Sequence, residues 1–472
     1  MKILGILPAV ALAVASGSAI AKVPASEAAK LGNELTPVGA IAKGNDDGSI
    51  PEWRGRELFT QEQVDLTRAQ LEEWRVSDPT KVRSYVYNEL ETRKDEIGEV
   101  IEAKFTITKA NYKDYAELLT TGHKAMFERY DDYKMIVYPT IRTGFFPQVI
   151  YDATKKNATT AELVGTDDVN GAELGFPFPI PGTGAEAIWN HKLKYKGDAV
   201  RRYNNQAIVK PDGSYKISKL IEDVKFKYGN ISEPGGTDLL AYYLSNVIEP
   251  ARVAGQLTLV HETADEGSGG RLAWIYNPGL GRVNRAPDVG YDNPYIGTDG
   301  EQFNDQVDVF NGSLDRYNWK LVGRKDMIIP YHNYELNSPE YKYRDLIQAG
   351  HINQDLVRYE VHRVWVVDAT LRDGTRHQFA RRTFYLDEDS WSIAVVDAYD
   401  NRNELWKMQE AYLVTLPFVP TVTGSPEAIF DLKSGRYFLT AMTNEDTISD
   451  FEATYSDSFF KPANLKRLAR KQ

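Results

Sequence analysis

The side chains that could support acid–base or metal chemistry are few and widely spaced in this sequence. Its seven histidines stand at positions 123, 191, 261, 332, 351, 362 and 377, and they form no HExxH or other metal-binding spacing. Glu360 and His362 would share one face of a predicted strand, where the predicted register places them opposite Asp387 and Tyr385. This is at most a hint of a metal site, so no metal site is predicted.

Short catalytic signatures are also missing from the sequence. It contains no GxSxG, no P-loop and no GxGxxG linked to a strand, and GTG at 182–184 indicates only a loop. The lack of cysteine excludes thiolate ligands, disulfides, a cysteine nucleophile and a lipidated cysteine. A hydrolase using paired carboxylates such as Glu360 and Asp387 needs no signature, and it stays open as an alternative if the acids face a cleft about 5 to 10 Å apart. The first expectation is a protein without catalytic residues or cofactors.

The stretch GNDDGSIPEW at 44–53 resembles the middle of a calcium loop. With Gly48 as the turn glycine in the sixth position, Lys43 and Arg54 occupy the first and twelfth positions. Two cations thus replace two oxygen ligands that calcium requires. An Asp-Gly turn that leads into an extended segment before Pro51 is favoured instead.

An apolar stripe that contains two arginines is the candidate ligand-binding surface. The dipeptide Asp373-Gly374 favours a two-residue hairpin loop, which fixes the register of the strands on either side. One face of this hairpin would carry Val361, Arg363, Trp365, Val367, Ala369 and Leu371, opposite Leu386, Phe384, Arg382, Ala380, Gln378 and Arg376. Arg382 would then lie opposite Trp365, at the distance of a cation–π contact.

The next turn decides whether these arginines are free to meet a ligand. If residues 387–390 form it, Arg382 lies opposite Val395 and diagonal to Asp397, and an Arg382–Asp397 ion pair is favoured over a ligand contact. Arg363 has no such partner in this register, which makes it the better candidate for an anionic head group. The candidate ligand-binding set is Arg363, Trp365, Val367, Arg382, Phe384, Trp391 and Val395, although aromatic strand residues more often form core.

The elements that must position this surface change character along the chain. Helices are predicted before about residue 160, over 62–74, over 108–119 with Thr108 as N-cap, and around 158–163. Strands and tight turns follow, at 199–209, 215–228, 256–262, 271–276 and 282–285, and in a meander from 358 to 414. The pattern predicts a mostly β fold with helices (α+β), built as a large curved antiparallel sheet or incomplete barrel with a helical N-terminal part.

The first residues predict export. A short positive start, an apolar run over 3–14 and the small residues Ala19-Ile20-Ala21 are typical of a signal peptide, with cleavage expected after Ala21. No later segment approaches about 18 uncharged apolar residues, so a soluble, non-lipidated periplasmic protein is expected. After the signal peptide at 1–21, an irregular arm and helical region at 22–170 and a sheet region at 171–472 are expected to form one continuous domain, since no linker is visible.

The charge balance limits the choice of partners. The formal net charge is −11, so the surface should repel nucleic acid and anionic membrane. The basic end at 465–471 is favoured as a solvated tail.

Several separated phrases together resemble one known family. They are LTPVGA at 35–40, GNDDGSIPEW at 44–53, PFPIP at 177–181, EAIWNH at 186–191, NPG at 277–279, RYEVHRVWVV at 358–367 and FYLDEDSW at 384–391. The chain resembles a domain-of-unknown-function family of Gram-negative periplasmic proteins that is often labelled outer-membrane lipoprotein-sorting-like. The resemblance covers nearly the whole chain after the signal peptide, and it favours a family signature over a calcium loop at 44–53.

This resemblance implies a fold and a set of partners. Its members look related to the Lol-pathway lipoprotein carriers, in which an incomplete antiparallel barrel wraps an apolar cavity covered by helices. They are commonly associated with an outer-membrane protein and a resistance-nodulation-division type exporter, and no catalytic residues are implied. The leading expectation is a periplasmic carrier for a lipid or other hydrophobic molecule. A structural adaptor of an envelope export complex is the alternative, and it would show an exposed apolar patch and no cavity.

Overall fold

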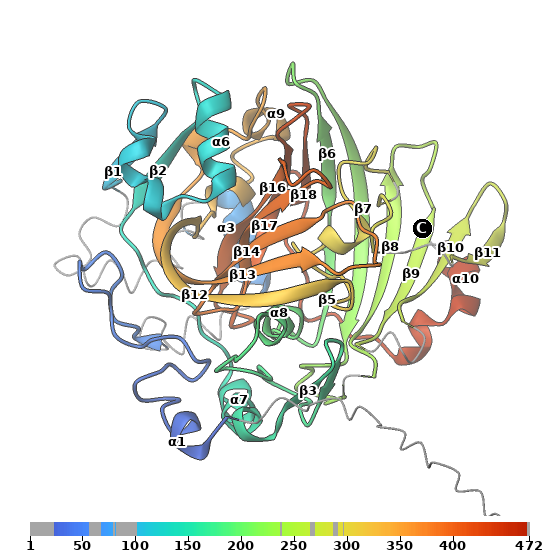
Figure 1. Cartoon of the computed structure of the whole chain (residues 1–472). Helices are drawn as coiled ribbons and strands as arrows, with labels where there is room; N and C mark the ends of the chain where they lie inside the picture. Colours follow the sequence, from blue (N-terminus) through green and yellow to red (C-terminus); the bar gives the residue numbers. More distant parts are fainter. Residues whose placement is uncertain are drawn as a thin grey trace, which may run out of the picture.

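One large sheet organises the molecule. The structure is a computed structural model of the chain, and it describes residues 23–55, 68–78, 81, 102–236, 238–264, 270–286, 291–295 and 297–469. Within these residues sixteen strands form a single curved sheet, and a separate hairpin joins two short strands (Figure 1). The predicted signal peptide at 1–21 and residues 62–67 of the first predicted helix lie outside the described residues.

The first half of the sheet is a run of antiparallel hairpins. Its strands are β5 (Ala199–Tyr203), β6 (Asn205–Val209), β7 (Tyr215–Phe226), β8 (Ala241–Glu249), β9 (Leu257–Glu262), β10 (Leu272–Asn277) and β11 (Arg282–Arg285). β5 and β6 both pair with β7, and the order then runs from β7 through β8, β9 and β10 to β11. The predicted hairpins in this region are confirmed.

The second half carries the predicted meander, and strands from earlier in the chain join it. Its strands are β12 (Tyr317–Pro330), β13 (Tyr359–Leu371), β14 (Arg381–Asp387), β15 (Ile393–Tyr399), β16 (Leu405–Leu416), β17 (Thr421–Asp431) and β18 (Tyr437–Met442). β1 (Phe105–Thr108) pairs with β2 (Lys134–Tyr138), and β3 (Glu162–Val164) and β4 (Asp168–Asn170) form the separate hairpin. β18 pairs with β6 and so joins the two halves, with Tyr437 opposite Val209.

The expected fold class is confirmed, with one correction. The protein is mostly strands in a large curved open sheet with a few helices, but the sheet is mixed. β2 runs parallel to β13 at Tyr359 and Glu360, whereas a purely antiparallel sheet was expected. This pairing involves a strand from the N-terminal part, which no hairpin signal could reveal.

The helices are short. They are α1 (Ala25–Ala28), α3 (Arg68–Ser77), α6 (Thr121–Arg129), α7 (Gln148–Thr160), α8 (Gly184–Lys192), α9 (Tyr343–Leu346) and α10 (Leu465–Leu468). Six 3₁₀ helices accompany them among the described residues, at Tyr112–Leu118, Asn304–Gln306, Glu335–Asn337, Gln354–Leu356, Asp457–Phe460 and Pro462–Asn464. The helix predicted over 108–119 is thus a 3₁₀ helix, and the signal near 158 is the end of α7. Each described helix falls short of the length and apolarity needed to cross a membrane.

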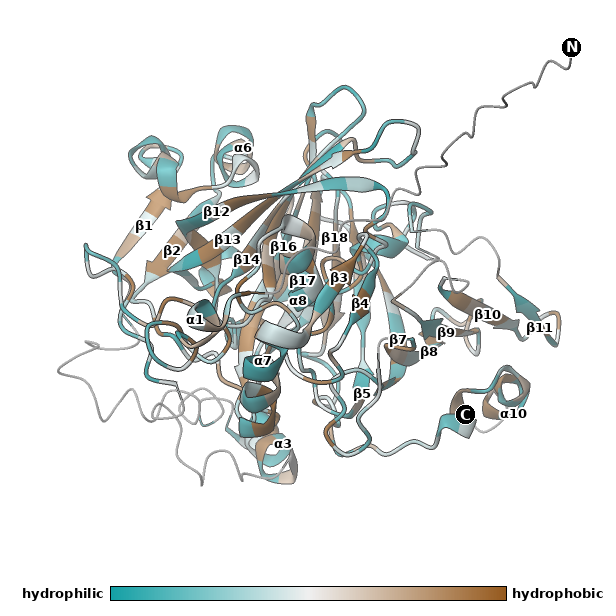
Figure 2. Ribbon diagram, turned by 60° about the horizontal axis from the view of Figure 1, so that its bottom comes forward, coloured by the Kyte–Doolittle hydropathy of each residue, from teal (hydrophilic) through white to brown (hydrophobic). Residues whose placement is uncertain are grey.

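Helices cover both faces of the central strands (Figure 2). The backbone N–H groups of Thr121 and Gly122 in α6 donate to Asp397 on β15, at 3.0 and 2.9 Å. α8 packs on the other face, where it meets β12 and β13 at Val367. The strand register places Val367 and Asp397 on opposite faces. The central strands are therefore buried on both sides and form the main hydrophobic core.

The start of α8 is fixed by a capping box and by a glycine. The Thr183 hydroxyl accepts from the N–H of Glu186, and the Glu186 carboxylate accepts from the N–H of Thr183. A Cβ at Gly184 would lie 2.8 Å from the Val367 side chain and 3.0 Å from the backbone of Lys320. Glycine therefore allows α8 to lie directly on the sheet.

Substitution at this contact should destabilise the protein. We expect Gly184→Ala to cost about 1–3 kcal/mol, because the methyl group must push α8 away from rigid backbone. Urea unfolding measures the loss. Gly236→Ala is the matched control, since a Cβ there meets nothing within 4 Å, and an equal loss in both variants would contradict this explanation.

Candidate functional site

A cavity of about 620 Å³ lies on one face of β7–β10. Alternate residues of these strands point into it: Leu220, Val224 and Phe226 on β7, Ala241, Tyr243, Ser245 and Val247 on β8, Thr258, Val260 and Glu262 on β9, and Ile275 on β10. The register explains this set, because Leu220 pairs with Val247, Tyr243 with Val260, and Ser245 with Thr258. The volume lies within the range of small-molecule sites.

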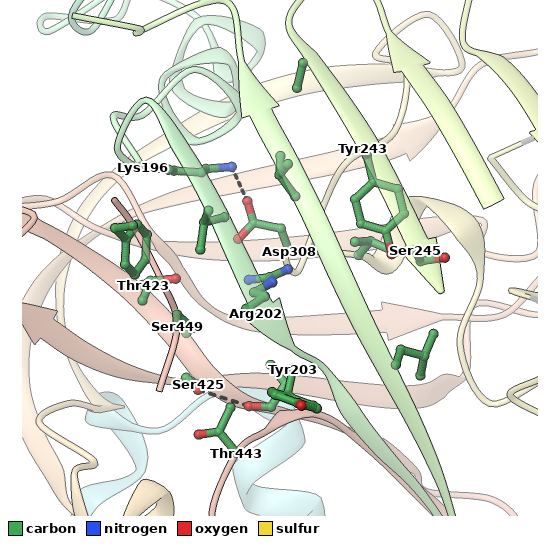
Figure 3. Close-up of a pocket in the computed structure, with 18 of the residues that line it drawn as sticks. Lys196, Arg202, Tyr203, Tyr243, Ser245, Asp308, Thr423, Ser425, Thr443 and Ser449 are labelled. Carbon is green, nitrogen blue, oxygen red and sulfur yellow. Dashed lines mark hydrogen bonds and ion pairs between the residues drawn. The ribbon is translucent and has the colours of Figure 1, made fainter. Parts of the chain in front are cut away.

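The facing wall comes from distant parts of the chain (Figure 3). It consists of the ends of β16 and β17, the segment after α8, the 304–311 segment and residues 448–451, with Leu71 and Arg75 of α3. Thr423, Ser425 and Ser449 are among its small polar side chains. Most of the wall is apolar, and polar groups gather at a few positions, which is the usual composition of a site for an amphiphilic molecule.

The other face of β8–β10 is covered by the end of the chain. Leu244, Leu257 and Leu259 point away from the cavity and form a small core with Phe460 and Leu465. The Tyr242 ring stacks on Phe460 with centroids 5.2 Å apart. The basic end at 465–471 was predicted to be a solvated tail, and in the part of it that the structure describes this is wrong for Leu465, which is 1% exposed.

One end of the cavity carries most of its charge. Lys196 forms an ion pair with Asp308, and the Lys194 amino group lies 3.7 Å from the same carboxylate. Burial opposes ionisation of Asp308, but the two lysines hold its pKa well below the usual range. Burial also lowers the pKa of Lys194 to about 8. Arg202 also lines the cavity. It lies on β5, which pairs with β7, and its Nε donates to Glu222 at 2.8 Å.

Glu427 lies behind this charged end on β17. It is buried and accepts from the Val309 N–H at 3.1 Å and from the Gln409 amide at 3.4 Å. Burial, with the negative charge of Asp308, raises its pKa to about 7. A carboxyl whose pKa is raised in the folded state contributes stability that is present below the unfolded pKa and lost as the pH rises through the folded pKa.

The stability of the protein should therefore fall between about pH 4.5 and pH 7 through this group. We expect Glu427→Gln, which resembles the protonated acid, to remove up to about 3 kcal/mol of this pH dependence and to raise the Tm above pH 7. Thermal unfolding across this pH range is the measurement. The exposed Glu452→Gln controls for the loss of one charge, and an unchanged slope in Glu427→Gln would rule out this origin.

The residues predicted to bind a ligand lie elsewhere. None of the seven lines this cavity. Val367, Phe384 and Trp391 are fully buried in the main core, and the Trp365 ring stacks on Trp391 with centroids 6.0 Å apart. The Trp391 Nε1 donates to the Val38 carbonyl at 2.9 Å, so the N-terminal arm covers this surface. The predicted ligand-binding residues therefore lie in the core and not on the cavity wall, and their contact with a ligand stays a prediction.

Both predicted arginines have partners that the sequence did not indicate. Arg363 was expected to be unpaired, but its Nη1 donates to Glu388 at 2.8 Å. Arg382 was expected to pair with Asp397 and instead forms an ion pair with Asp305 at 2.7 Å. Its guanidinium also lies over aromatic rings, and Trp365 is not one of them. Those rings belong to Phe310, Tyr317, Phe379 and Phe384. The cation over Trp365 is Arg324, at 3.9 Å.

Val395 lies on the opposite face from Arg382. The β14–β15 register places Arg382 opposite Ala398, with a bulge between Tyr385 and Leu386, whereas Val395 was the expected partner. The bulge changes the pairing by an odd number of residues, which exchanges the two faces of β15. Val395 is therefore buried on the face that α6 covers.

A second cluster of polar side chains lies in the main core, beside the N-terminal arm (residues 23–55). His362, Asp387 and Asp389 offer ligand atoms within 4.8 Å of one another, and within the described part of the chain they form the group that could hold a metal ion. Each already has a protein partner: Asp389 accepts from Arg142, Asp387 from Ser390, and the His362 Nε2 contacts Glu360. Burial alone would lower the pKa of His362, but Glu360 and Asp387 raise it above its usual value. The group is arranged as an ion-pair network.

This network holds the N-terminal arm in place. Arg142 donates to both oxygens of Asp389 and to the carbonyls of Ile41, Ala42 and Pro51. The arm contains the 44–53 stretch, in which the Gly48 N–H donates to the Asn45 carbonyl and Gly48 adopts φ of +74°. The predicted Asp-Gly turn is thus confirmed.

Sequence reasoning missed the charged end of the cavity. Its residues come from the segment after α8, from β5 and from the 304–311 segment. Two signals were present in the sequence. Lysine alternates at 192, 194 and 196 just before Gly197, and a double arginine at 201 and 202 lies within the first strand of the sheet region.

The fold and the cavity define a mostly β protein whose open curved sheet forms one wall of a large, largely apolar cavity. A family model described as "Protein of unknown function (DUF1329)" matches residues 106–466. An uncharacterized protein of Pseudomonas aeruginosa is 41% identical over 464 residues, which cover 97% of this chain and 96% of that protein. The chain belongs to the DUF1329 family, and the expected family is confirmed.

Two solved structures resemble part of this chain at low sequence identity. One is a domain described as outer membrane lipoprotein-sorting from Vibrio parahaemolyticus, at 15% identity and a TM-score of 0.42, covering 60% of this chain and 98% of that chain. Another is a LolA superfamily protein from Nitrosomonas europaea, at 12% identity and a TM-score of 0.37, covering 60% of this chain and 98% of that chain.

Proposed function

We propose that the protein is a periplasmic carrier that binds a lipid or another hydrophobic molecule in the cavity along β7–β10. The observation that carries this proposal is the cavity itself, about 620 Å³ in volume and walled mainly by apolar side chains. Burying an alkyl chain there gains about 0.8 kcal/mol for each CH₂ group. A packed sheet with no cavity would offer no such gain.

The same observation favours a carrier over a structural adaptor. An adaptor was expected to show an exposed apolar patch and no cavity, and the described structure contains a cavity. The large hydrophobic residues that are exposed in the described part are few and scattered: Val76, Val149, Val164, Tyr215, Leu280 and Val322. An outer-membrane partner and an exporter stay predictions that follow from the family resemblance.

The proposed role requires no catalysis. The acids considered for a hydrolase, Glu360 and Asp387, are both fully buried and do not line the cavity. Glu360 accepts from Arg358 at 2.7 Å and contacts His332 at 2.7 Å, which ties it into the ion-pair network. Placement in the periplasm follows from the predicted signal peptide and cleavage after Ala21.

The test is native mass spectrometry, with organic extraction, on the protein purified from a periplasmic fraction. A discrete added mass of lipid size that extraction removes is the expected result, and it would name the ligand class. A clean mass for the polypeptide alone, together with no saturable binding of a fluorescent apolar probe, would overturn the proposal. The mass of the polypeptide also shows whether residues 1–21 have been removed.

A further inference from the structure

The charge of the cavity wall contrasts with that of the whole chain. The formal net charge of the chain is −11. The cavity is nevertheless lined by six cationic side chains and three carboxylates: Arg75, Lys192, Lys194, Lys196, Arg202 and Arg271, against Glu262, Asp308 and Glu335. A cleft that reverses the sign of its surroundings concentrates a ligand of the opposite charge. This points to an anionic group on the ligand.

Most of these cations are held by the protein. Arg75 donates to the backbone carbonyls of Asn337, Thr443 and Asp446. Arg271 donates to Glu262 and to the Asn311 carbonyl, and Lys192 donates to the Gly312 carbonyl. Lys194 and Lys196 share Asp308. A ligand would have to displace one of these contacts to use them fully.

Arg202 differs from the other cations of the wall. Its Nε donates to Glu222, but within the described residues no hydrogen bond engages its Nη1 or Nη2. Its side chain is 31% exposed, and it lies among the residues that line the cavity (Figure 3). An arginine with two free N–H-bearing nitrogens at its end offers a fork that fits a carboxylate or phosphate with two parallel hydrogen bonds.

The surroundings hold this fork in one orientation. Glu222 is 2% exposed, and its carboxylate accepts from the Arg202 Nε at 2.8 Å and from Asn204 and Tyr243 at 2.6 Å each. These contacts fix the Nε edge of the guanidinium against the sheet. Asp308, an acid of the cavity wall, forms ion pairs with Lys194 and Lys196, which offset its negative charge. The end of the guanidinium can therefore receive an anion.

We propose that Arg202 binds the anionic head group of an amphiphile, a carboxylate or a phosphate, while the alkyl part lies along β7–β10. This inference rests on the proposed carrier function and adds the chemical class of the ligand. It replaces Arg363 with Arg202 as the residue that orients the head group. Uncharged molecules of the same length would lack this contact.

Isothermal titration calorimetry with three ligands of equal chain length tests the inference. The ligands are a saturated long-chain alcohol, the corresponding fatty acid and the corresponding alkyl phosphate. We expect one or both anions to bind at least about tenfold more tightly than the alcohol, because a charge-assisted pair of hydrogen bonds is worth at least that factor. The two anions distinguish a carboxylate from a phosphate head group.

Variants of Arg202 make the test specific. Arg202→Lys keeps the charge beside Glu222 but loses the fork, and it should remove most of the preference for the anion and leave alcohol binding within about twofold. Arg202→Gln combined with Glu222→Gln removes both charges together and should do the same, which covers the case in which one variant folds poorly. Arg201→Lys is the matched control, because Arg201 is on the other face of β5, 44% exposed and paired with Asp223.

The outcomes separate this inference from the carrier function. Equal affinity for all three ligands, or an anion preference that survives in both Arg202 variants, would overturn the inference and leave the carrier function standing. Failure of every ligand to bind the unaltered protein would overturn both.

Discussion

Replacing Arg142 with methionine should cost the protein about 3–5 kcal/mol of stability, the largest effect that we expect from a single substitution. The Arg142 side chain is 1% exposed and makes five hydrogen bonds, two to Asp389 and three to carbonyls of the N-terminal arm. Removing it leaves a buried carboxylate without its arginine partner, and the three carbonyls each lose one hydrogen bond, although that of Ala42 keeps the Trp53 N–H. Urea unfolding gives the loss, and limited proteolysis should show earlier cleavage within residues 23–55.

Two further variants identify the cause. Arg142→Met combined with Asp389→Asn should recover part of the stability, because the buried charge is removed together with its partner. Arg344→Met is the surface control. Its side chain is 78% exposed and lies 3.7 Å from Asp345, so a loss of no more than about 1 kcal/mol is expected. If Arg142→Met were as mild as Arg344→Met, the network would not be holding the arm.

Filling the cavity should strongly weaken ligand binding while leaving the fold intact. Thr258 lies at the centre of the wall, between Ser245 on β8 and Ile275 on β10, and it is only half-buried. Thr258→Trp would place an indole where the ligand lies. If it excludes about three methylene groups, the loss is about 2.4 kcal/mol, or roughly a 60-fold weaker affinity. Titration with a fluorescent fatty acid measures it.

The controls for this variant separate volume from polarity and from general damage. Thr258→Val keeps the size of the side chain and should bind within about threefold of the unaltered protein, because only a hydroxyl is lost. Val322→Trp adds the same indole at an exposed position at the bulge of β12, and it should not alter binding. Full binding by Thr258→Trp with an unchanged Tm would show that the ligand does not occupy this cavity.

The sequence was a good guide to strands and a poor guide to register. The Asp373-Gly374 turn is real, with Gly374 at φ of +81°, but the loop extends further and Leu371 bonds to Ala380. The β13–β14 pairing therefore differs from the prediction by four residues. A register shift by an even number of residues keeps each side chain on its predicted face of the sheet. Trp365, Val367 and Phe384 therefore share one face, as predicted. The bulge in β14–β15 causes an odd shift, and no residue pattern announced it.

The location of the cavity could not be read from local patterns for a different reason. On β8 and β9 both faces are apolar, because one lines the cavity and the other packs against the C-terminal segment. Hydrophobic alternation therefore does not distinguish them. The cavity also depends on Asp308, Thr423 and Ser449, whose segments meet the strands only after the chain has folded. The stripe on β13 and β14 was the stronger local signal, and it is core.

The pairing of β18 with β6 also sets the order in which the sheet can be completed. Tyr437 and Phe438 pair with Val209 and Ile208, so the two halves of the sheet join only when nearly the whole polypeptide is available. Contacts this distant in sequence slow folding, because a long loop must close before they form. A chain that leaves the ribosome or crosses a membrane from its N-terminus would therefore keep the edge of β6 unpaired until late. The topology alone therefore delays completion of the sheet until the C-terminal strands are available.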